Sequence, residues 1–472
     1  MDAVIDLLNT VLWGYVLIYG LLAVGVFFTL RLGFIQVRHF PEMIRNITGA
    51  KQADRAGITP FQALCTSLAS RVGTGNIAGV AVALTLGGPG AIFWMWIVAA
   101  LGMATAFAES TLAQLFKVRD AEGRYRGGPA FYIARGLGAP WAGGLFSACL
   151  ILSFGLVFNA VQANSIADAM EGAFGLPKLA TGVALAVLAG IIIFGGIATI
   201  ARAAEVIVPV MALSYIAVAL YAVVANIAEV PSMLALIVRS AFGLEPAAGG
   251  VAGSMAAAML NGVKRGLFSN EAGMGSAPNI AAVATPDPHH PASQGFVQSL
   301  GVFIDTLVIC TATALLILLS GVLQTGTEAN GTQLTQEALR VHVGAAGPYF
   351  VAIAVLFFAF TSIIGNYAYA ENALVFLGLG RRAGLVALRL GVLAMVVWGA
   401  MQSVATVFNA ADASMGLMAT INLVAILLLS GLVVRLARDY ASKRRRGEQP
   451  VFLASEMPEL AGQIDPEIWR RR

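Results

Sequence analysis

Two short segments place glycine, polar and charged residues together inside otherwise apolar stretches. They are residues 70–76, SRVGTGN, and residues 261–275, NGVKRGLFSNEAGMG. Glycine permits backbone conformations and close approaches that side chains disfavour, so both segments can leave a regular helix. Amides released at such a break attract an anion such as a carboxylate, and released carbonyl oxygens suit a hard cation. The two segments are therefore the first candidates for a binding site.

The composition places both segments in a membrane. Of 472 residues, 58% are hydrophobic and only 11% are charged, against about 25% charged in a typical soluble domain. The mean hydropathy is +0.81. A soluble protein of this size could not cover so much apolar surface, which excludes an ordinary soluble enzyme, a disordered chain and a disulfide scaffold. The net charge of +4 indicates no nucleic-acid partner, and the three cysteines show no CxxC spacing, so we expect neither a disulfide nor a metal-thiolate site.

We predict eleven membrane spans, because a spanning helix needs about 20 apolar residues. The first covers 11–30, and its leader carries Asp2 and Asp6 in place of lysines, which argues against a signal peptide. The ten others cover 60–86, 89–116, 140–170, 179–200, 205–226, 248–284, 294–320, 348–376, 384–402 and 404–434.

The positive residues divide unequally among the loops. Loops on one side, counted up to Arg446, hold 19 Lys and Arg, and loops on the other side hold three. Cytoplasmic loops are the positive ones, so we expect a multi-pass protein of the cell (inner) membrane with its N-terminus outside and its C-terminus in the cytoplasm. The tail ends in Trp469 and three arginines, and we expect it at the inner membrane surface. The outer loop 322–347 contains TQLTQEALRVHVG, an amphipathic helical pattern that suits either a lid or a surface helix.

The glycine-rich segments also divide the chain. We predict an N-terminal span with its loop, two sets of five spans, and a cytoplasmic tail, with boundaries at 1–59, 60–228, 229–440 and 441–472. Each set of five opens with an interrupted span, and the two interrupted spans run in opposite directions. Such a pair indicates a transporter site near the midplane of the bilayer. Small-residue packing at Gly75 and Gly79 is the alternative, but it leaves Arg71 and Asn76 unexplained.

The two segments also carry a resemblance to a known family. TPFQALCTSLASRVGTGNIAGVAVALTLGGPGAIFWMW and GVKRGLFSNEAGMGSAPNIAAVA resemble signature blocks of the alanine/glycine:cation symporters, and the similarity covers about residues 11–440. The resemblance implies an all-α polytopic membrane protein with a LeuT-like fold, in which two inverted five-helix repeats follow one extra N-terminal helix. It also implies alternating-access symport of sodium with a small neutral amino acid, and no enzymatic activity.

The resemblance assigns substrate contacts to both interrupted spans. At the first, the amides of Thr74 and Gly75 are implied to bind the substrate carboxylate, and Asn76 to contact substrate or cation. At the second, the backbone around residues 266–269 is implied to receive the ammonium group. The span 140–170 adds side chains that face the substrate, for which an interhelical contact is the alternative. The implied set is Thr74, Gly75, Asn76, Phe158, Gln162, Gly266, Phe268, Ser269 and Asn366.

A sodium site is implied between the first interrupted span and span 348–376. The adjacent hydroxyls of Thr361 and Ser362 match a pair that binds sodium in many LeuT-like carriers, although such pairs also occur as backbone-bonded residues in ordinary helices. Carbonyl oxygens complete the set. The implied Na+ ligands are Ala69, Val72, Phe358, Thr361 and Ser362.

Two residues depart from the family pattern. Many members carry a large aromatic residue where this chain has Asn366, in the block GNYAYAE, so a larger polar substrate such as glutamine becomes plausible beside alanine and glycine. Arg71 lies at the first break, where a charge needs a partner; Glu271 and Glu109 are the candidates. A guanidinium there disfavours a sodium site next to the substrate.

Buried acidic residues keep a second mode of coupling open. Glu109 is placed where a carboxylate can accept amides freed by the second break, and Asp305 and Asp412 lie within spans. Protonation of Glu109 or Asp305 would support a proton-coupled permease of the same fold, whereas structural pairing is the alternative. A channel fits paired broken helices less well, and the sequence contains no HExxH, GxSxG or P-loop pattern that would favour an intramembrane enzyme.

Overall fold

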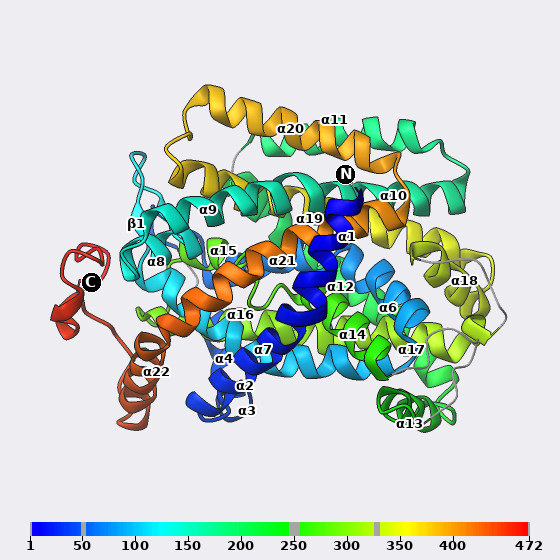
Figure 1. Ribbon diagram of the computed structural model, residues 1–472, viewed down its shortest axis with the longest axis horizontal. Helices are drawn as coiled ribbons and strands as arrows, with labels where there is room; N and C mark the ends of the chain where they lie inside the picture. The colour runs from blue at the N-terminus through cyan, green and yellow to red at the C-terminus, as the bar shows by residue number, and fades with distance from the viewer. Residues whose placement is uncertain (1, 49–52, 196, 245–254, 325–330, 471–472) are drawn as a thin grey trace.

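The computed structural model describes residues 2–48, 53–195, 197–244, 255–324 and 331–470 (Figure 1). Its regular structure is helical apart from one antiparallel hairpin, β1 (Val118–Arg119) and β2 (Tyr125–Arg126). Helices suit this composition because a segment in hydrocarbon must satisfy its backbone polar groups internally. Eight described helices are long and apolar enough to cross a bilayer; the count of eleven spans stays a prediction.

The N-terminal half contains a leading helix and the first five-helix repeat. α1 continues into α2 through a π-helical stretch, and a second such stretch joins α9 to α10. The helices are α1 (Asp2–Val11), α2 (Ile18–Arg31), α3 (Ile35–Arg38), α4 (Phe40–Thr48), α5 (Pro60–Arg71), α6 (Val80–Gly87), α7 (Gly90–Leu115), α8 (Pro129–Gly136), α9 (Pro140–Leu150), α10 (Phe158–Phe174), α11 (Lys178–Ile193) and α12 (Ile197–Ala225).

The second half contains the helices of the predicted second repeat. A π-helical stretch joins α16 to α17, and they form one long apolar helix. The helices are α13 (Val230–Ala241), α14 (Met255–Asn270), α15 (Pro278–Val283), α16 (Pro291–Val302), α17 (Thr311–Ser320), α18 (Gly331–Val343), α19 (Ala346–Phe376), α20 (Arg382–Ala400), α21 (Val404–Leu428) and α22 (Ser430–Arg445).

Three connecting features differ from or add to the prediction. The amphipathic helix predicted in loop 322–347 is present as α18. The last predicted span, 404–434, is shorter than expected, because α21 ends at Leu428 and α22 starts separately. α13 is an unpredicted helix between α12 and α14, and Pro231 in its first turn favours a helix start there.

The two interrupted helices lie side by side and run in opposite directions. The Ile58 amide donates to the Val283 carbonyl (3.3 Å) and the Thr285 amide donates to the Ile58 carbonyl (2.9 Å), so the start of α5 meets the end of α15. We call this contact the α5–α15 junction. At the opposite end, Gly87 of α6 packs against Asn261 of α14. The antiparallel pair agrees with the inverted halves predicted from the sequence.

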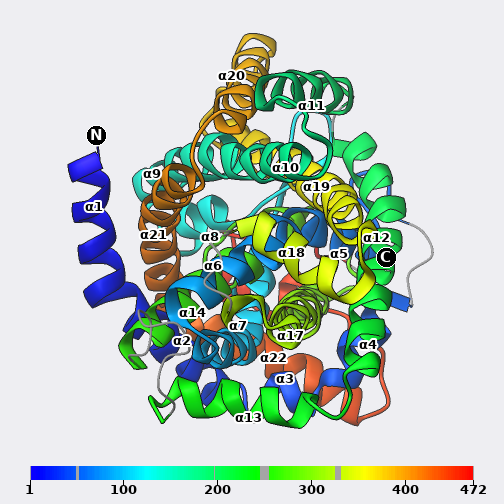
Figure 2. The same cartoon turned by 90° about the vertical axis from the view of Figure 1, so that its right-hand side faces the viewer.

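The bundle has two distinct ends. The hairpin, α8, α22 and the C-terminus gather at one, which we call the tail end, and α18 lies at the other (Figure 1). Seen from the α18 end, α18 lies across the middle of the bundle, and α11 and α20 pack together at its periphery (Figure 2). The location of the C-terminal tail at the inner membrane surface stays a prediction, and the structure shows the tail packed against the protein. Trp469 is only 1% exposed because its indole nitrogen finds a backbone acceptor, the Leu115 carbonyl, within the protein (3.2 Å).

Candidate functional site

α5 is fixed by local interactions at both of its ends. At its start, the Gln62 amide donates to Thr59 Oγ1 and the Thr59 amide donates to Gln62 Oε1, both at 3.1 Å. This capping box satisfies donors that a helix start leaves free. At its end, the Val72 amide still donates to the Leu68 carbonyl (2.7 Å), and the chain leaves the helix at Val72 and Gly73.

The amides freed at this first break are held by side chains. The Gly73 amide donates to Asn76 Oδ1 and the Thr74 amide donates to Gln162 Oε1, both at 3.0 Å. Thr74 and Asn76 are fully buried, and Gln162 is 2% exposed. The predicted side chain on α10 therefore reaches the predicted amide, and its oxygen is an acceptor of the kind that a carboxylate would also present.

Close approach explains the glycines of the first break. A Cβ atom on Gly73 would lie 2.3 Å from Ser362 Oγ and 2.8 Å from Gln162 Oε1. A Cβ atom on Gly75 would lie 3.0 Å from the Ser269 Cα. Residues of α10, α14 and α19 thus converge on Gly73 in the break and on Gly75, where the π-helical turn Gly75–Gly79 begins, and only glycine permits this approach.

The second break starts later than the sequence predicts. α14 is regular through Asn270, and the unwound segment runs from 271 to 277. Gly262 lies within the regular helix α14. A Cβ atom there would lie 2.3 Å from the Ala91 carbonyl oxygen of α7, so glycine at this position serves helix packing. Gly266 also lies within the helix, whereas the carbonyls of Phe268 and Ser269 belong to the last turn, where a helix leaves acceptors free.

Two buried carboxylates hold the second break. The Gly273 amide donates to Glu109 Oε1 (3.2 Å), and Asn422 Nδ2 donates to Glu109 Oε2 (2.8 Å). The predicted contact between Glu109 and an amide freed by the break is therefore present. Glu271 accepts from Ser276 Oγ (2.5 Å) and from Ser70 Oγ (2.9 Å), so it links the second break to the last turn of α5.

Asp305 joins both broken helices, a role that the sequence analysis does not assign. Its Oδ1 accepts from Asn76 Nδ2 and its Oδ2 accepts from Ser269 Oγ, both at 2.7 Å. Thr306 Oγ1 also donates to Oδ2 (2.7 Å). The available signal was an acidic residue inside a span, which is costly unless it serves a purpose.

Arg71 is almost completely buried, at 2% exposed. Its Nη1 donates to the Gln298 carbonyl at 3.2 Å. Among the ion pairs of the described residues, none within 4 Å joins Arg71 to Glu271 or Glu109. Both carboxylates nevertheless interact electrostatically with the Arg71 guanidinium, as expected of residues that neutralise it, while their direct hydrogen bonds come from other donors.

Four of the five predicted sodium ligands lie together between α5 and α19. Ser362 Oγ lies 2.9 Å from the Ala69 carbonyl oxygen and 3.1 Å from that of Phe358. Thr361 Oγ1 lies 3.3 Å and 2.9 Å from the same two oxygens. All four residues are buried. Two hydroxyls and two carbonyls form a neutral oxygen set that suits a hard cation of single charge. Val72, at the end of α5, has no contact with these oxygens among those described.

Aromatic rings and an ion pair cover the breaks on the α18 side. Phe158 stacks on Phe268 with ring centres 4.8 Å apart, and Phe268 lies 5.3 Å from Phe408. Arg265 contacts both carboxylate oxygens of Asp412 at 2.5 Å. α10, α14 and α21 are thereby joined over the site.

Asn366 is fully buried, and both ends of its amide are engaged. Its Nδ2 donates to Asn159 Oδ1 (3.1 Å), and its Oδ1 accepts from Ser70 Oγ (2.6 Å). It thus connects α19 to α10 and to the last turn of α5, two residues before the first break.

The inverted halves and the meeting of their breaks define the class of protein. The structure of MhsT in complex with L-phenylalanine aligns with this chain at a TM-score of 0.54 and 14% identity, covering 82% of this chain and 99% of that one. The chain has the LeuT fold of secondary transporters, as predicted.

The family follows from sequence comparison. The model of the sodium:alanine symporter family matches residues 1–454, and the chain belongs to this family. The amino-acid carrier protein AlsT of Bacillus subtilis is 50% identical, over 99% of this chain and 97% of its own length. The probable sodium/glutamine symporter GlnT of the same organism is 49% identical, over 96% and 93%. The chain is a multi-pass, sodium-coupled symporter of the alanine class, and sodium is its co-transported ion.

Proposed function

We propose that the space where the two breaks meet binds a neutral amino acid. The amides of Thr74 and Gly75 receive the carboxylate, and the last-turn carbonyls of Phe268 and Ser269 receive the ammonium group. The observation that carries this proposal is the convergence of α10, α14 and α19 on the glycines of the first break. Gln162 supports it, since its carboxamide oxygen already accepts from the Thr74 amide.

Phe158, Asn76 and Gly266 complete the proposed substrate set in different ways. Phe158 stacks on Phe268 and shields the substrate from the α18 side. Asn76 accepts from the Gly73 amide and donates to Asp305. It therefore stabilises the backbone of the first break and does not itself need to contact the substrate. Gly266 contributes indirectly, because it sits within α14 and allows that helix to approach α7.

We propose that sodium binds the oxygens of Ala69, Phe358, Thr361 and Ser362, with the Val72 carbonyl as the fifth ligand. These oxygens belong to α5 and α19, which come from different repeats. A cation bound between them favours the conformation in which the two helices are in contact, and coupling requires such a difference between states. Substrate then bridges the two breaks, and the aromatic cover closes over it.

The proposed substrate is alanine or a larger neutral amino acid such as glutamine. Asn366 supports the wider range, because the family resemblance implies a bulky ring at this position in many members, where this chain has a carboxamide. The relative named as a probable sodium/glutamine symporter, at 49% identity, supports it as well. A competition panel of the common amino acids against labelled alanine tests the range. Competition by alanine and glycine alone would refute it.

The sodium coupling of this chain is tested in proteoliposomes. We expect accumulation of alanine under an inward sodium gradient with no pH gradient. A second candidate, coupling to protons, draws on Glu109, Glu271 and Asp305, three carboxylates buried within 1% exposure. Accumulation driven by a pH gradient in the absence of sodium would favour this second candidate.

We further propose that the protein lies in the cell membrane with the tail end in the cytoplasm and the N-terminus outside. The excess of Lys and Arg in the loops of the tail end supports this orientation. The repeats are proposed to span 60–228 and 229–440. Labelling of single cysteines placed in the α18 and α22 regions of intact cells tests the orientation; labelling of α22 from outside would reverse it.

A further inference from the structure

The C-terminal tail, residues 447–470, folds back onto the tail end of the bundle. Its Phe452 amide donates to the His289 carbonyl (2.9 Å), just before α16, and its Ala454 amide donates to the Trp469 carbonyl (2.8 Å). The match to the family model ends at residue 454, within the tail and before Trp469.

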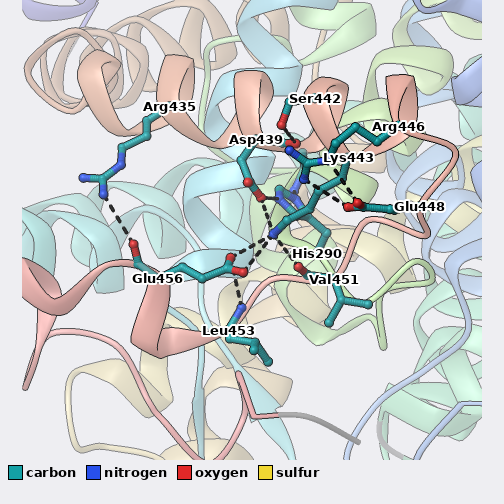
Figure 3. A network of polar contacts seen from close by, with 11 residues as sticks. His290, Arg435, Asp439, Ser442, Lys443, Arg446, Glu448, Val451, Leu453 and Glu456 are labelled. Carbon is teal, nitrogen blue, oxygen red and sulfur yellow. Dashed lines mark hydrogen bonds and ion pairs between the residues drawn. The ribbon is translucent and has the colours of Figure 1, made fainter.

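α22 anchors this tail through charged groups (Figure 3). Lys443 Nζ lies 2.8 Å from Asp439 Oδ2 on the same helix and 2.9 Å from Glu456 Oε2 in the tail. It also donates to the Val451 carbonyl (2.6 Å). Arg435 of α22 pairs with Glu459 of the tail. Together, these contacts between α22 and the tail fix the path of the tail across the end of the bundle.

Trp469 lies against the end of α7. Its Nε1 donates to the Leu115 carbonyl at 3.2 Å, one of the last carbonyls of α7, which a helix leaves without an internal partner. Its ring centre lies 5.4 Å from Lys117 Nζ, two residues further along. The same ammonium lies 3.9 Å from the ring centre of Tyr125. Lys117 is fully buried, so these aromatic faces contribute to its stabilisation.

Lys117 also contacts the α5–α15 junction. Its Nζ donates to the Ala284 carbonyl at 2.9 Å, on the α15 side. Tyr125, which packs under the same ammonium, donates its amide to the Ala56 carbonyl (2.9 Å) on the α5 side. The ammonium that Trp469 covers therefore contacts the α15 side of the junction directly, and reaches the α5 side through Tyr125.

We propose that Trp469 is a positioning residue for transport, which acts through Lys117 to hold the α5–α15 junction closed. The proposal rests on the proposed function in one respect, namely that the two broken helices separate at the tail end during alternating access. Contacts made only in the closed junction favour that conformation, so the tail sets how often this end opens.

The test measures opening directly, in purified detergent-solubilised protein. Ala284 is fully buried and contacts Lys117 through its backbone, so Ala284→Cys reports on the junction. In this background, Trp469→Ala should raise the rate of maleimide labelling about three- to tenfold, the range expected for loss of a partly desolvated cation–π contact. Trp469→Phe keeps a ring beside Lys117 and should stay within about twofold of the parent.

A double-variant cycle separates positioning from general loosening. Lys117→Met should raise the labelling rate as Trp469→Ala does, and the double variant should rise no further, because both act along one path. Glu456→Gln, which weakens the anchor at Lys443, should give a smaller rise and remains informative if Trp469→Ala does not fold. An unchanged rate in Trp469→Ala, or a double variant whose rise is the product of the single rises, would overturn the proposal. Uptake is not the readout, so the outcome is independent of the substrate and sodium assignments.

Discussion

The hydroxyl of Thr361 is shared by two helices, since it lies 3.3 Å from the Ala69 carbonyl and 2.9 Å from that of Phe358. Loss of a polar contact to a charged group costs about 1.5–3 kcal/mol. We therefore expect Thr361→Ala to raise the sodium concentration for half-maximal alanine uptake by roughly tenfold or more, without reordering the competing substrates. Thr361→Ser keeps the hydroxyl and is the control. A sodium dependence that stays unchanged in Thr361→Ala would contradict the sodium site.

Asn366 tests the proposed substrate pocket. An indole at this buried position adds bulk beside the last turn of α5 and removes the bonds to Ser70 and Asn159. We expect Asn366→Trp to narrow the substrate range toward alanine and glycine, measured by competition against labelled alanine. Asn366→Ala removes the same bonds without added bulk, and should keep the wider range. If the same amino acids compete with labelled alanine for uptake by Asn366→Trp as by the parent protein, the pocket assignment is wrong.

Single residues were predictable where a local pattern carried them. Glycine beside charge marked the first break, and the adjacent Thr361 and Ser362 hydroxyls marked a pair that does lie beside Ala69. The hydrogen bonds that Asp305 accepts from both broken helices were not predictable in this way. Its partners Asn76 and Ser269 lie far from it in the chain, and only the antiparallel packing of the broken helices brings the three together.

At the scale of elements, the Arg265–Asp412 pair joins α14 to α21. Both residues are buried, and removal of one partner of such a pair costs about 3–5 kcal/mol when the other charge is left unpaired. Asp412 keeps a second partner, Lys264 Nζ at 3.6 Å, so the larger loss is expected for Asp412→Asn. Asp412→Asn and Arg265→Gln should each lower the unfolding temperature of the purified protein. The double variant should lose less than the sum of the two, with a coupling free energy of about 1–3 kcal/mol. Strict additivity of the losses in unfolding free energy would show that the two helices do not depend on this pair.

Folding stability should fall in mild acid because of His290, which caps α16 and contacts α22. Burial lowers the pKa of His290 below its ordinary value of 6.5, and Asp439 offsets this only in part. Nδ1 accepts from the Ala292 amide at the start of α16 (3.0 Å), and Nε2 contacts Asp439 Oδ2 (3.1 Å), so the neutral ring fits the site. The charge of Lys443 lowers the pKa of His290 further, and the charge of Glu456 raises it. With a lowered folded pKa, stability is constant above about pH 6.5 and falls below it.

His290→Asn is the matched control, because asparagine can still cap α16 but does not titrate. Thermal unfolding is followed between about pH 7.5 and pH 5.5, the window around the ordinary histidine pKa. The parent should lose stability more steeply across this window than His290→Asn. Asp439 has a lowered pKa because the hydrogen bonds from His290 and Lys443 outweigh its burial. The stability that the ionised Asp439 contributes is therefore lost only at a pH below this window. Parallel curves for the two proteins would exclude His290 as the source.

Over the whole molecule, the sequence predicted the inverted halves and most helices, because hydrophobic length and glycine-bearing interruptions are local signals. The features at the ends of the bundle were predicted less well. α13 and the β1–β2 hairpin are short and sit in loops, where apolar periodicity is weak. The position of Trp469 depends on the end of α7 and on Lys117, and no pattern within the tail itself indicates such partners.

The whole-molecule prediction concerns separation of the two halves at the α5–α15 junction. Ile58 and Ala284 are paired across a parallel bridge, whose strand spacing of about 4.8 Å lies within the Cα separation that a disulfide needs. Oxidised Ile58→Cys/Ala284→Cys protein should therefore lose sodium-driven uptake, because these helices must part at the tail end, and reduction should restore it. Sodium-dependent substrate binding should survive oxidation, because alternating access requires the α18 side to open while the junction stays closed. Each single-cysteine variant, treated with the same oxidant, controls for chemistry at the three native cysteines, all of which are buried. If the cross-linked protein took up substrate as fast as the chemically reduced protein, transport would proceed without opening of this junction.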